Sequence, residues 1–381
     1  MSTLILQDGT TFIGESFGAK KDCDGEVVFN TGMVGYPESM TDPSYRGQIL
    51  VFTYPLIGNY GVPSEEKNAW GFSKNFESEA IHVRGIVVAN ISEDYSHMAA
   101  VSSLSRWMEH HGIPGITGID TRALTKKLRE TGVMLGRIQI DNEELRMKNE
   151  TQDPNTLNLV AEVSCTEPVT YEPEGGIWNA TIVAFDCGMK RNILRSFLKR
   201  GIRVHRVPWN YDLQNSKLPY DGVFISNGPG DPKACKETIA QIRWSIQQGI
   251  PTFGICLGNQ LMALAVGGDT YKLKYGHRGA NQPCQELRME NEELRMTDRC
   301  IITSQNHGFA VDENSLPKGW HVWFKNANDG SVEGISHESG KFRAVQFHPE
   351  STPGPEDANY LFDEFIAQLT KKEHLQNAVF R

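Results

Sequence analysis

The chain has 381 residues and a net charge of −9, and 39% of its residues are apolar and 9% aromatic. At about 150 residues per domain this length predicts two or three domains, and the composition excludes a disordered or fibrous chain. No apolar run reaches the roughly 18 residues of a membrane helix, and the N-terminus meets a turn too soon for a secretion signal. Without a dense Lys/Arg cluster, nucleic-acid binding is not expected.

The seven cysteines are scattered and form no C-x-x-C pair. This spacing predicts neither a disulfide framework nor a metal site, and it favours a reducing cytoplasm.

The first 150 residues predict a smaller mixed β/α domain rich in short strands. Residues 4–6 and 10–13 flank an Asp-Gly turn and predict a hairpin. Further strands are expected at 26–30, 49–53 and 85–90. Two helices should follow, one over about 102–111 and one that begins at the cap residue Asp120 and ends before Gly132.

Residues 151–178 are turn-rich and lack periodicity, which predicts a linker. From residue 179 strands and helices alternate. Strands are expected at 182–185, 204–207, 222–226, 251–255 and 342–347, and helices at 191–200, 233–248, 257–266 and 357–371. Alternation at these lengths predicts a doubly wound, mostly parallel sheet covered by helices on both faces.

The tetrapeptide Glu-Leu-Arg-Met occurs at 144–147, 286–289 and 293–296. We expect each copy to form a short charged helix with one Leu/Met edge, on a solvated surface insertion. A coiled-coil contact is the alternative, but the apolar seam is far too short for one.

The strongest chemical motif is G-I-C-L-G at 254–258, at a predicted strand-to-helix junction. Glycines on both sides of a nucleophile permit a sharp turn that holds the Cys256 side chain at the carboxyl end of the sheet. The Leu257 N–H would then face a substrate carbonyl, and the helix N-terminus favours a thiolate. The alternative is a buried structural cysteine.

A cysteine nucleophile needs a base and a group that orients the base. F-H-P-E at 347–350 follows a predicted strand. In extended chain, residues i and i+2 point the same way, so Glu350 could bind one ring nitrogen of His348 while the other faces Cys256. The alternative is a surface histidine with an acid nearby by chance.

The loop S-N-G-P-G-D-P at 226–232 follows a strand at the same predicted sheet edge. Its glycines could present backbone N–H groups to an oxyanion. A phosphate loop or a plain turn are the alternatives, but the loop does not match G-x-G-x-x-G, and no G-x-x-x-x-G-K-[ST] occurs in the chain.

Together with S-Q-N-H-G-F at 304–309, these motifs resemble the class I, triad-type glutamine amidotransferase family over about residues 179–370. The resemblance implies a flavodoxin-like amidotransferase domain at 179–381. The first domain resembles the small-subunit family of carbamoyl-phosphate synthases, and the resemblance then covers essentially the whole chain. The motifs that carry this second resemblance lie at 29–36, 41–45, 53–59, 118–122 and 274–279. Many relatives have histidine at the position of Asn259.

The resemblance implies that glutamine is hydrolysed through a thioester on Cys256, with His348 as base and acid and Glu350 as its orienter. It implies glutamine contacts from Ser44, Gly228, Gly230, Leu257, Gln260, Asn306, Gly308 and Phe309. Since Ser44 comes from the first domain, the glutamine site is expected at the domain interface. His307 would have only a positional role.

The resemblance further implies a partner, a large synthetase subunit that makes carbamoyl phosphate from bicarbonate, ammonia and ATP. ATP and Mg²⁺ would bind that subunit, in a heterodimer or higher oligomer, with no cofactor or metal on this chain. Because the sequence ends just after the amidotransferase helix, we expect no fused synthetase. The alternatives are a subunit that serves another synthetase and a catalytically inactive regulatory subunit.

Overall fold

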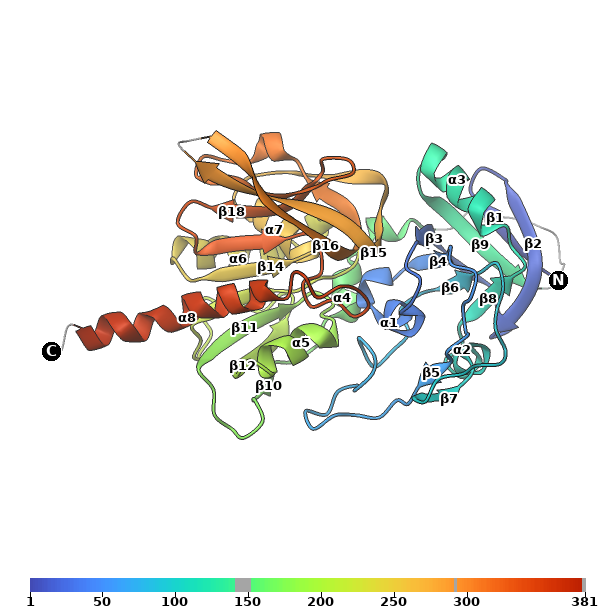
Figure 1. Ribbon diagram of the computed structural model, residues 1–381, viewed down its shortest axis with the longest axis horizontal. Helices are drawn as coiled ribbons and strands as arrows, with labels where there is room; N and C mark the ends of the chain where they lie inside the picture. Colours follow the sequence, from blue (N-terminus) through green and yellow to red (C-terminus); the bar gives the residue numbers. More distant parts are fainter. Residues whose placement is uncertain (141–151, 291–292, 379–381) are drawn as a thin grey trace. The chain divides into compact units, whose positions relative to one another are not determined.

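The computed structural model describes residues 1–140, 152–290 and 293–378 (Figure 1). The chain divides into two compact units. Unit 1 comprises Met1–Leu159 and Lys274–Gly279, and unit 2 comprises Val160–Leu273 and Ala280–Arg381. No helix in the described ranges is both long and apolar enough to cross a membrane.

Unit 1 is built on a closed barrel that contains both parallel and antiparallel strand pairs. The expected hairpin is present and turns at Gly9, whose φ of 85° suits glycine. Around the barrel the strands are β1 (Ser2–Leu6), β2 (Thr11–Gly18), β8 (Pro114–Thr117), β6 (Gly85–Val87), β4 (Gln48–Phe52), β3 (Cys23–Asn30) and β9 (Met134–Ile140). A separate pair joins β5 (Val62–Pro63) and β7 (Ala100–Ser102).

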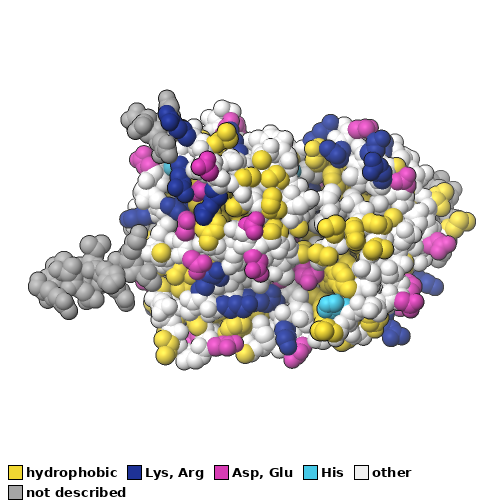
Figure 2. Space-filling model, viewed as in Figure 1, with side chains coloured by type: hydrophobic (Ala, Val, Ile, Leu, Met, Phe, Trp, Pro, Cys, Tyr) yellow, Lys and Arg dark blue, Asp and Glu magenta, His cyan; other side chains and the backbone are white. Residues whose placement is uncertain are grey.

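Alternate residues of the barrel strands enter two separate apolar clusters, as strand geometry dictates. On β4, Ile49 packs with α3 (Thr121–Thr131), whereas Leu50 packs with α1 (Tyr36–Thr41) and α2 (Leu104–His110). Both α2 and α3 begin at side-chain caps, Ser103 and Asp120. The exposed side of α3 carries Lys and Arg side chains, visible in Figure 2. Helices α2 and α3 confirm the two helices predicted for this part of the chain, whereas α1, β8 and β9 were not predicted.

Unit 2 contains a ten-stranded sheet in which four consecutive strand pairings are parallel, which confirms the predicted fold class. The order is β10 (Val169–Tyr171), β12 (Ile202–Pro208), β11 (Ala180–Asp186), β13 (Gly222–Ile225), β14 (Thr252–Ile255), β19 (Phe342–Val345), β18 (Val332–His337), β17 (Trp320–Asn326), β15 (Thr270–Glu290) and β16 (Glu293–Val311).

Helices cover both faces of this sheet (Figure 1). On one face Val223 and Ile225 of β13 pack with α6 (Lys236–Gln247) and α7 (Leu257–Ala265). On the other face the ring of Phe224 lies 5.0 Å from that of Phe197 in α5 (Arg191–Leu198). The same aromatic cluster includes Phe362 of α8 (Tyr360–Ala378). The alternating sides of one strand thus anchor both helical layers, and the carboxyl edge of the sheet stays open for the loops that follow the strands.

The segment expected to be a linker contains secondary structure. Within it lie the 3₁₀ turn η2 (Pro154–Thr156), helix α4 (Leu159–Val163) and strand β10, which pairs antiparallel with β12. These elements have three to five residues, too few for a periodic pattern to show in the sequence.

The expectation of helical Glu-Leu-Arg-Met segments is wrong where the structure describes them. The second and third copies lie in the hairpin strands β15 and β16. The residue types favour a helix, but β15 pairs with β17, where Glu286 lies opposite Phe324. Leu287 joins the main apolar cluster and Glu286 accepts the indole N–H of Trp323 at 3.2 Å. Tertiary pairing therefore overrides local propensity, and the segment is not wholly a surface insertion; the copy at 144–147 lies outside the described residues.

Candidate active site

Cys256 occupies a sharp turn between β14 and α7. Its φ of 55° lies in the left-handed region, which non-glycine residues rarely adopt. The flanking glycines leave no room for side chains: a Cβ on Gly254 would lie 2.7 Å from Gly258 backbone, and one on Gly258 would lie 2.4 Å from the Ile225 carbonyl oxygen. The turn therefore has the geometry of a nucleophile elbow, with the cysteine at the N-terminus of a nine-residue helix.

His348 and Glu350 form a fully buried pair at the same sheet edge. Nδ1 of His348 lies 2.7 Å from Oε1 of Glu350. The backbone here is a turn, closed by the Ser351 N–H that donates to the His348 carbonyl, and not the extended chain that we expected. Since Nδ1 is occupied, Nε2 is the ring nitrogen left for Cys256, whose sulfur interacts electrostatically with the imidazole.

The charges of this pair follow from its surroundings. Burial alone lowers the pKa of His348, but the Glu350 carboxylate and then Cys256 outweigh burial and raise the pKa to about 10. Burial alone raises the pKa of Glu350, but Lys190 and His348 outweigh it and hold the pKa at about 2. Lys190 Nζ lies 3.0 Å from Glu350 Oε1. The site is therefore built to hold an imidazolium–carboxylate pair.

The glycine loop after β13 packs against the elbow. A Cβ on Gly228 would lie 2.8 Å from Cδ2 of Leu257, so these two candidate oxyanion residues are neighbours. Gly230 has a φ of 83° and closes the loop before η3 (Pro232–Ala234). The arrangement brings backbone N–H groups of the loop and of the α7 N-terminus to the same edge as the thiol.

Strand β16 supplies the other side of the site. The Asn306 carbonyl oxygen lies 3.6 Å from Cys256 Sγ. Gln260 donates its amide N–H groups to the Phe309 carbonyl at 3.0 Å and to Gln346 at 3.2 Å, and its expected contact with glutamine stays a prediction. Gly308 and Phe309 are half-buried and hence reachable from outside. The structure thus brings together the candidate residues of unit 2 that lie on α7 and β16.

Ser44 lies in unit 1, in the 3₁₀ turn η1 (Pro43–Tyr45), where its N–H donates to Asp42 at 2.9 Å. Its expected contact with glutamine stays a prediction, as does the location of the glutamine site at a domain interface.

Asn259 lies wholly buried in α7 behind the elbow. Its Nδ2 donates to Gln346 at 3.3 Å, so the side chain packs inside unit 2 and supplies no base to Cys256.

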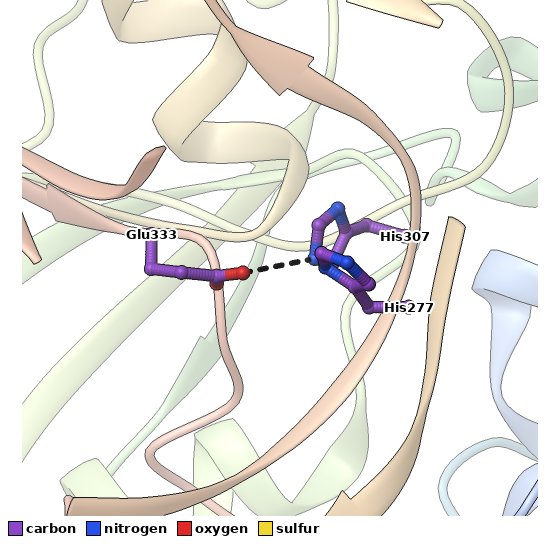
Figure 3. A group of neighbouring side chains, drawn as sticks. All are labelled: His277, His307 and Glu333. Atoms are coloured by element: carbon purple, nitrogen blue, oxygen red, sulfur yellow. Dashed lines mark ion pairs between the residues drawn. The ribbon is translucent and has the colours of Figure 1, made fainter. Parts of the chain in front are cut away.

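A second buried pair joins His307 of β16 to Glu333 of β18 (Figure 3). His307 Nε2 lies 3.7 Å from Glu333 Oε1, and Nδ1 lies 2.9 Å from the Phe309 carbonyl, the same oxygen that Gln260 contacts. The geometry supports a positional role for His307. Sequence reasoning missed Glu333, and no local signal singles it out. It also missed Lys190, although Lys190 follows β11 at the edge that carries the other site residues.

Two family models match the chain in sequence order. Residues 183–368 match the class I glutamine amidotransferase model. Residues 4–138 match the model of the carbamoyl-phosphate synthase small chain, CPSase domain. The small-chain match falls within unit 1, and the amidotransferase match falls on unit 2 except for Lys274–Gly279.

Whole-chain relatives agree with these matches. The chain is 52% identical to the multifunctional protein CAD of Squalus acanthias over 368 residues, but it spans 16% of that protein. It is 49% identical to the carbamoyl phosphate synthase arginine-specific small chain of Chaetomium globosum and 47% identical to that of Aspergillus oryzae. These two matches cover 97% and 99% of this chain, and 78% and 82% of the relatives. The chain therefore belongs to the carbamoyl-phosphate synthase small-chain family.

Proposed function

We propose that the chain is the glutaminase subunit of a carbamoyl-phosphate synthase and hydrolyses glutamine to glutamate and ammonia. The observation that carries the proposal is the strained elbow cysteine beside a buried His348–Glu350 pair. A thiol, a base and an orienting acid in this arrangement suit acyl transfer from an amide. A φ of 55° at a cysteine strains the backbone, and a catalytically inactive regulatory subunit would not require this strain.

The reaction follows from the geometry in two halves. The Cys256 thiolate attacks the side-chain amide carbon of glutamine, and N–H groups of Leu257 and the glycine loop stabilise the oxyanion. The C–N bond breaks as His348 gives a proton to the leaving nitrogen, which departs as ammonia and leaves a γ-glutamyl thioester. His348 then takes a proton from water, the hydroxide attacks the thioester, and glutamate leaves as the thiolate is restored.

The partner in this proposal is a large synthetase subunit that consumes the ammonia. ATP and Mg²⁺ would act on that partner, where they activate bicarbonate; no phosphate-loop motif occurs in this sequence. Ammonia in neutral water is mostly protonated and not nucleophilic, so the proposal includes an enclosed path between the subunits. We further propose a heterodimer in the cytoplasm. The relatives include arginine-specific chains and multifunctional proteins, and the product could serve arginine or pyrimidine synthesis.

One assay with two nitrogen sources tests this division of labour. With the large subunit, ATP and bicarbonate present, the wild-type complex should make carbamoyl phosphate from either glutamine or ammonium salt. The Cys256→Ser complex should retain only the ammonium reaction, because the change removes the thiol and leaves the partner intact. Loss of both reactions in an assembled Cys256→Ser complex would contradict the proposal.

A further inference from the structure

A buried aspartate stands at the carboxyl end of β11, outside the set of residues that carry out the reaction. Asp186 is fully buried, and its Oδ1 accepts the backbone N–H groups of Gly188 at 3.0 Å and Met189 at 2.7 Å. Its Oδ2 accepts the N–H of Cys165, just past α4, at 2.7 Å. One carboxylate therefore fixes the turn at 187–190 and ties it to the segment after α4.

The charge of Asp186 is balanced by Arg206 on the neighbouring strand β12. The Arg206 side chain donates from Nε to Oδ2 at 2.9 Å. Burial alone raises the pKa of Asp186, but Arg206 and the Met189 N–H outweigh burial and keep the pKa below its ordinary value. The carboxylate thus stays ionised, the state in which it accepts hydrogen bonds from N–H groups most strongly.

The turn that Asp186 holds lies directly against the candidate oxyanion loop. The Cys187 N–H donates to Ser226 Oγ at 2.9 Å, and the Lys190 N–H donates to Asn227 Oδ1 at 3.1 Å. The Cys187 carbonyl oxygen lies only 2.0 Å from where a Cβ on Gly228 would be. A shift of the turn would therefore shift Gly228.

The same turn also reaches the acid of the triad. Lys190 Nζ lies 3.0 Å from Glu350 Oε1 and donates to the Ser351 carbonyl at 2.7 Å. The Lys190 side chain is 4% exposed, so its contacts lie inside the protein. The turn at 187–190 consequently contacts both halves of the site, the oxyanion loop on one side and Glu350 on the other.

We propose that Asp186, held by Arg206, is a positioning residue for glutamine hydrolysis: by fixing the turn at 187–190 it aligns Gly228 with the elbow and Lys190 with Glu350. This inference rests on the proposed glutaminase function. Asp186 touches no reacting atom, so its removal should affect the rate of the chemical step more than the binding of glutamine.

The test compares Asp186 with Asp221, which lies just before β13 and whose carboxylate contacts the amino end of β11. Asp186→Ala removes the acceptors of the active-site turn. The control, Asp221→Ala, removes an acceptor of the Thr181 N–H at 2.9 Å, at the amino end. Small misplacement of catalytic groups costs up to about 100-fold, so kcat for Asp186→Ala should fall about 10- to 100-fold while KM changes by less than about threefold. Asp221→Ala should stay within about twofold of the wild type in both constants, since it lies away from the site.

A second variant displaces the turn and leaves the ion pair intact. Gly188 has a φ of 116°, and a Cβ there would lie 3.1 Å from Cδ of Pro229 in the glycine loop. Gly188→Ala should therefore lower kcat in the same way. If Asp186→Ala is insoluble, Gly188→Ala alone tests whether the position of the turn at 187–190 controls kcat.

Alkylation of Cys256 by iodoacetamide, followed on the Cys256 peptide by mass spectrometry, needs no glutamine hydrolysis. It should be slower in Asp186→Ala and Gly188→Ala than in the wild type and unchanged in Asp221→Ala, because misaligned Lys190 and Glu350 support the His348 imidazolium less well. A wild type that does not hydrolyse glutamine would contradict the proposed function, and alkylation would still test the positioning. Folded Asp186→Ala or Gly188→Ala protein with wild-type kcat, or with wild-type alkylation, would overturn the inference.

Discussion

The elbow around Cys256 and the hairpin of β15 and β16 differ in how strictly the local sequence determines the backbone conformation. In the elbow, both flanking glycines lie so close to backbone that a single Cβ would clash. In the hairpin, two copies of the same tetrapeptide meet different surroundings: Leu287 is 7% exposed and Leu294 is 38% exposed. A motif determines the local structure when steric contacts restrict the residue type at each of its positions. Where no such contacts exist, as in the repeated tetrapeptide, the strands that pack around each copy determine its burial.

Replacing the nucleophile should have the largest effect, because it removes the chemistry and keeps the elbow. Cys256→Ser should lose glutamine hydrolysis by several orders of magnitude, since members of a triad act as a unit. Glutamine binding, measured by calorimetry, should persist. A serine variant that hydrolyses glutamine normally would show that the elbow is structural only.

Glu350→Gln should cost less than His348→Asn, because an orienting group usually contributes less than the base it holds. We expect a fall in kcat of about 10²- to 10⁴-fold with the fold retained. Steady-state kinetics of the two variants measure the difference. Wild-type turnover in Glu350→Gln would remove Glu350 from the triad.

The steric argument for the elbow can be tested at Gly258, where a Cβ would lie 2.4 Å from the Ile225 carbonyl. Gly258→Ala should lower the free energy of unfolding by about 1–3 kcal/mol and reduce kcat, because the elbow must shift. Gly268→Ala is a matched control just beyond the same helix, since its closest contact would be 3.1 Å. Equal effects of the two substitutions on denaturant unfolding would refute the steric account.

The two leucines of the repeated motif give the sharpest test of the hairpin. Leu287→Ala should lower the free energy of unfolding by about 2–4 kcal/mol, because it opens a cavity in the main cluster of unit 2. Leu294→Ala should change it by less than about 0.5 kcal/mol, because the side chain is already partly solvated. Urea titrations measure both. Similar losses would mean that the copies are equivalent after all.

The buried pair His348–Glu350 predicts a pH window for stability. Glu350 has its pKa lowered from 4.5 to about 2, so its contribution is full above pH 4.5 and is lost as the pH falls toward 2. His348 has its pKa raised from 6.5 to about 10, so its contribution is full below pH 6.5 and is lost as the pH rises toward 10. The stability difference between wild type and Glu350→Gln should therefore be largest between about pH 4.5 and 6.5. A difference that is flat from pH 3 to 9 would contradict this coupling.

Much of this fold could be predicted from the sequence because its elements carry local signals. The hairpin at Gly9, the cap at Asp120 and the alternation from β11 to α7 depend on residues close together in the chain. The elbow motif is likewise local, because its two glycines lie only two residues before and after Cys256 in the sequence. Helix α1 has six residues and a proline at its start, too short for periodicity to show.

The unpredicted parts depend on residues brought together from distant segments. Lys190 meets Glu350 only because β11 and β19 end at the same sheet edge. Glu286 lies in a strand that pairs with β17 on one side and β16 on the other. The sequence around Lys190 does not indicate its contact with Glu350, and the sequence around Glu286 does not indicate its pairing with β17. Such contacts can be identified only once the fold is known.

The six residues Lys274–Gly279 belong to unit 1 although they lie far along the chain. The Val133 N–H donates to the Lys274 carbonyl at 2.9 Å, and the Phe29 ring stacks with Tyr275. A gene fragment that stops at residue 159 would therefore encode a barrel that lacks part of its own packing. Complementation with a peptide that covers this stretch, or rearrangement of the gene to append it, would be needed to produce that unit in isolation.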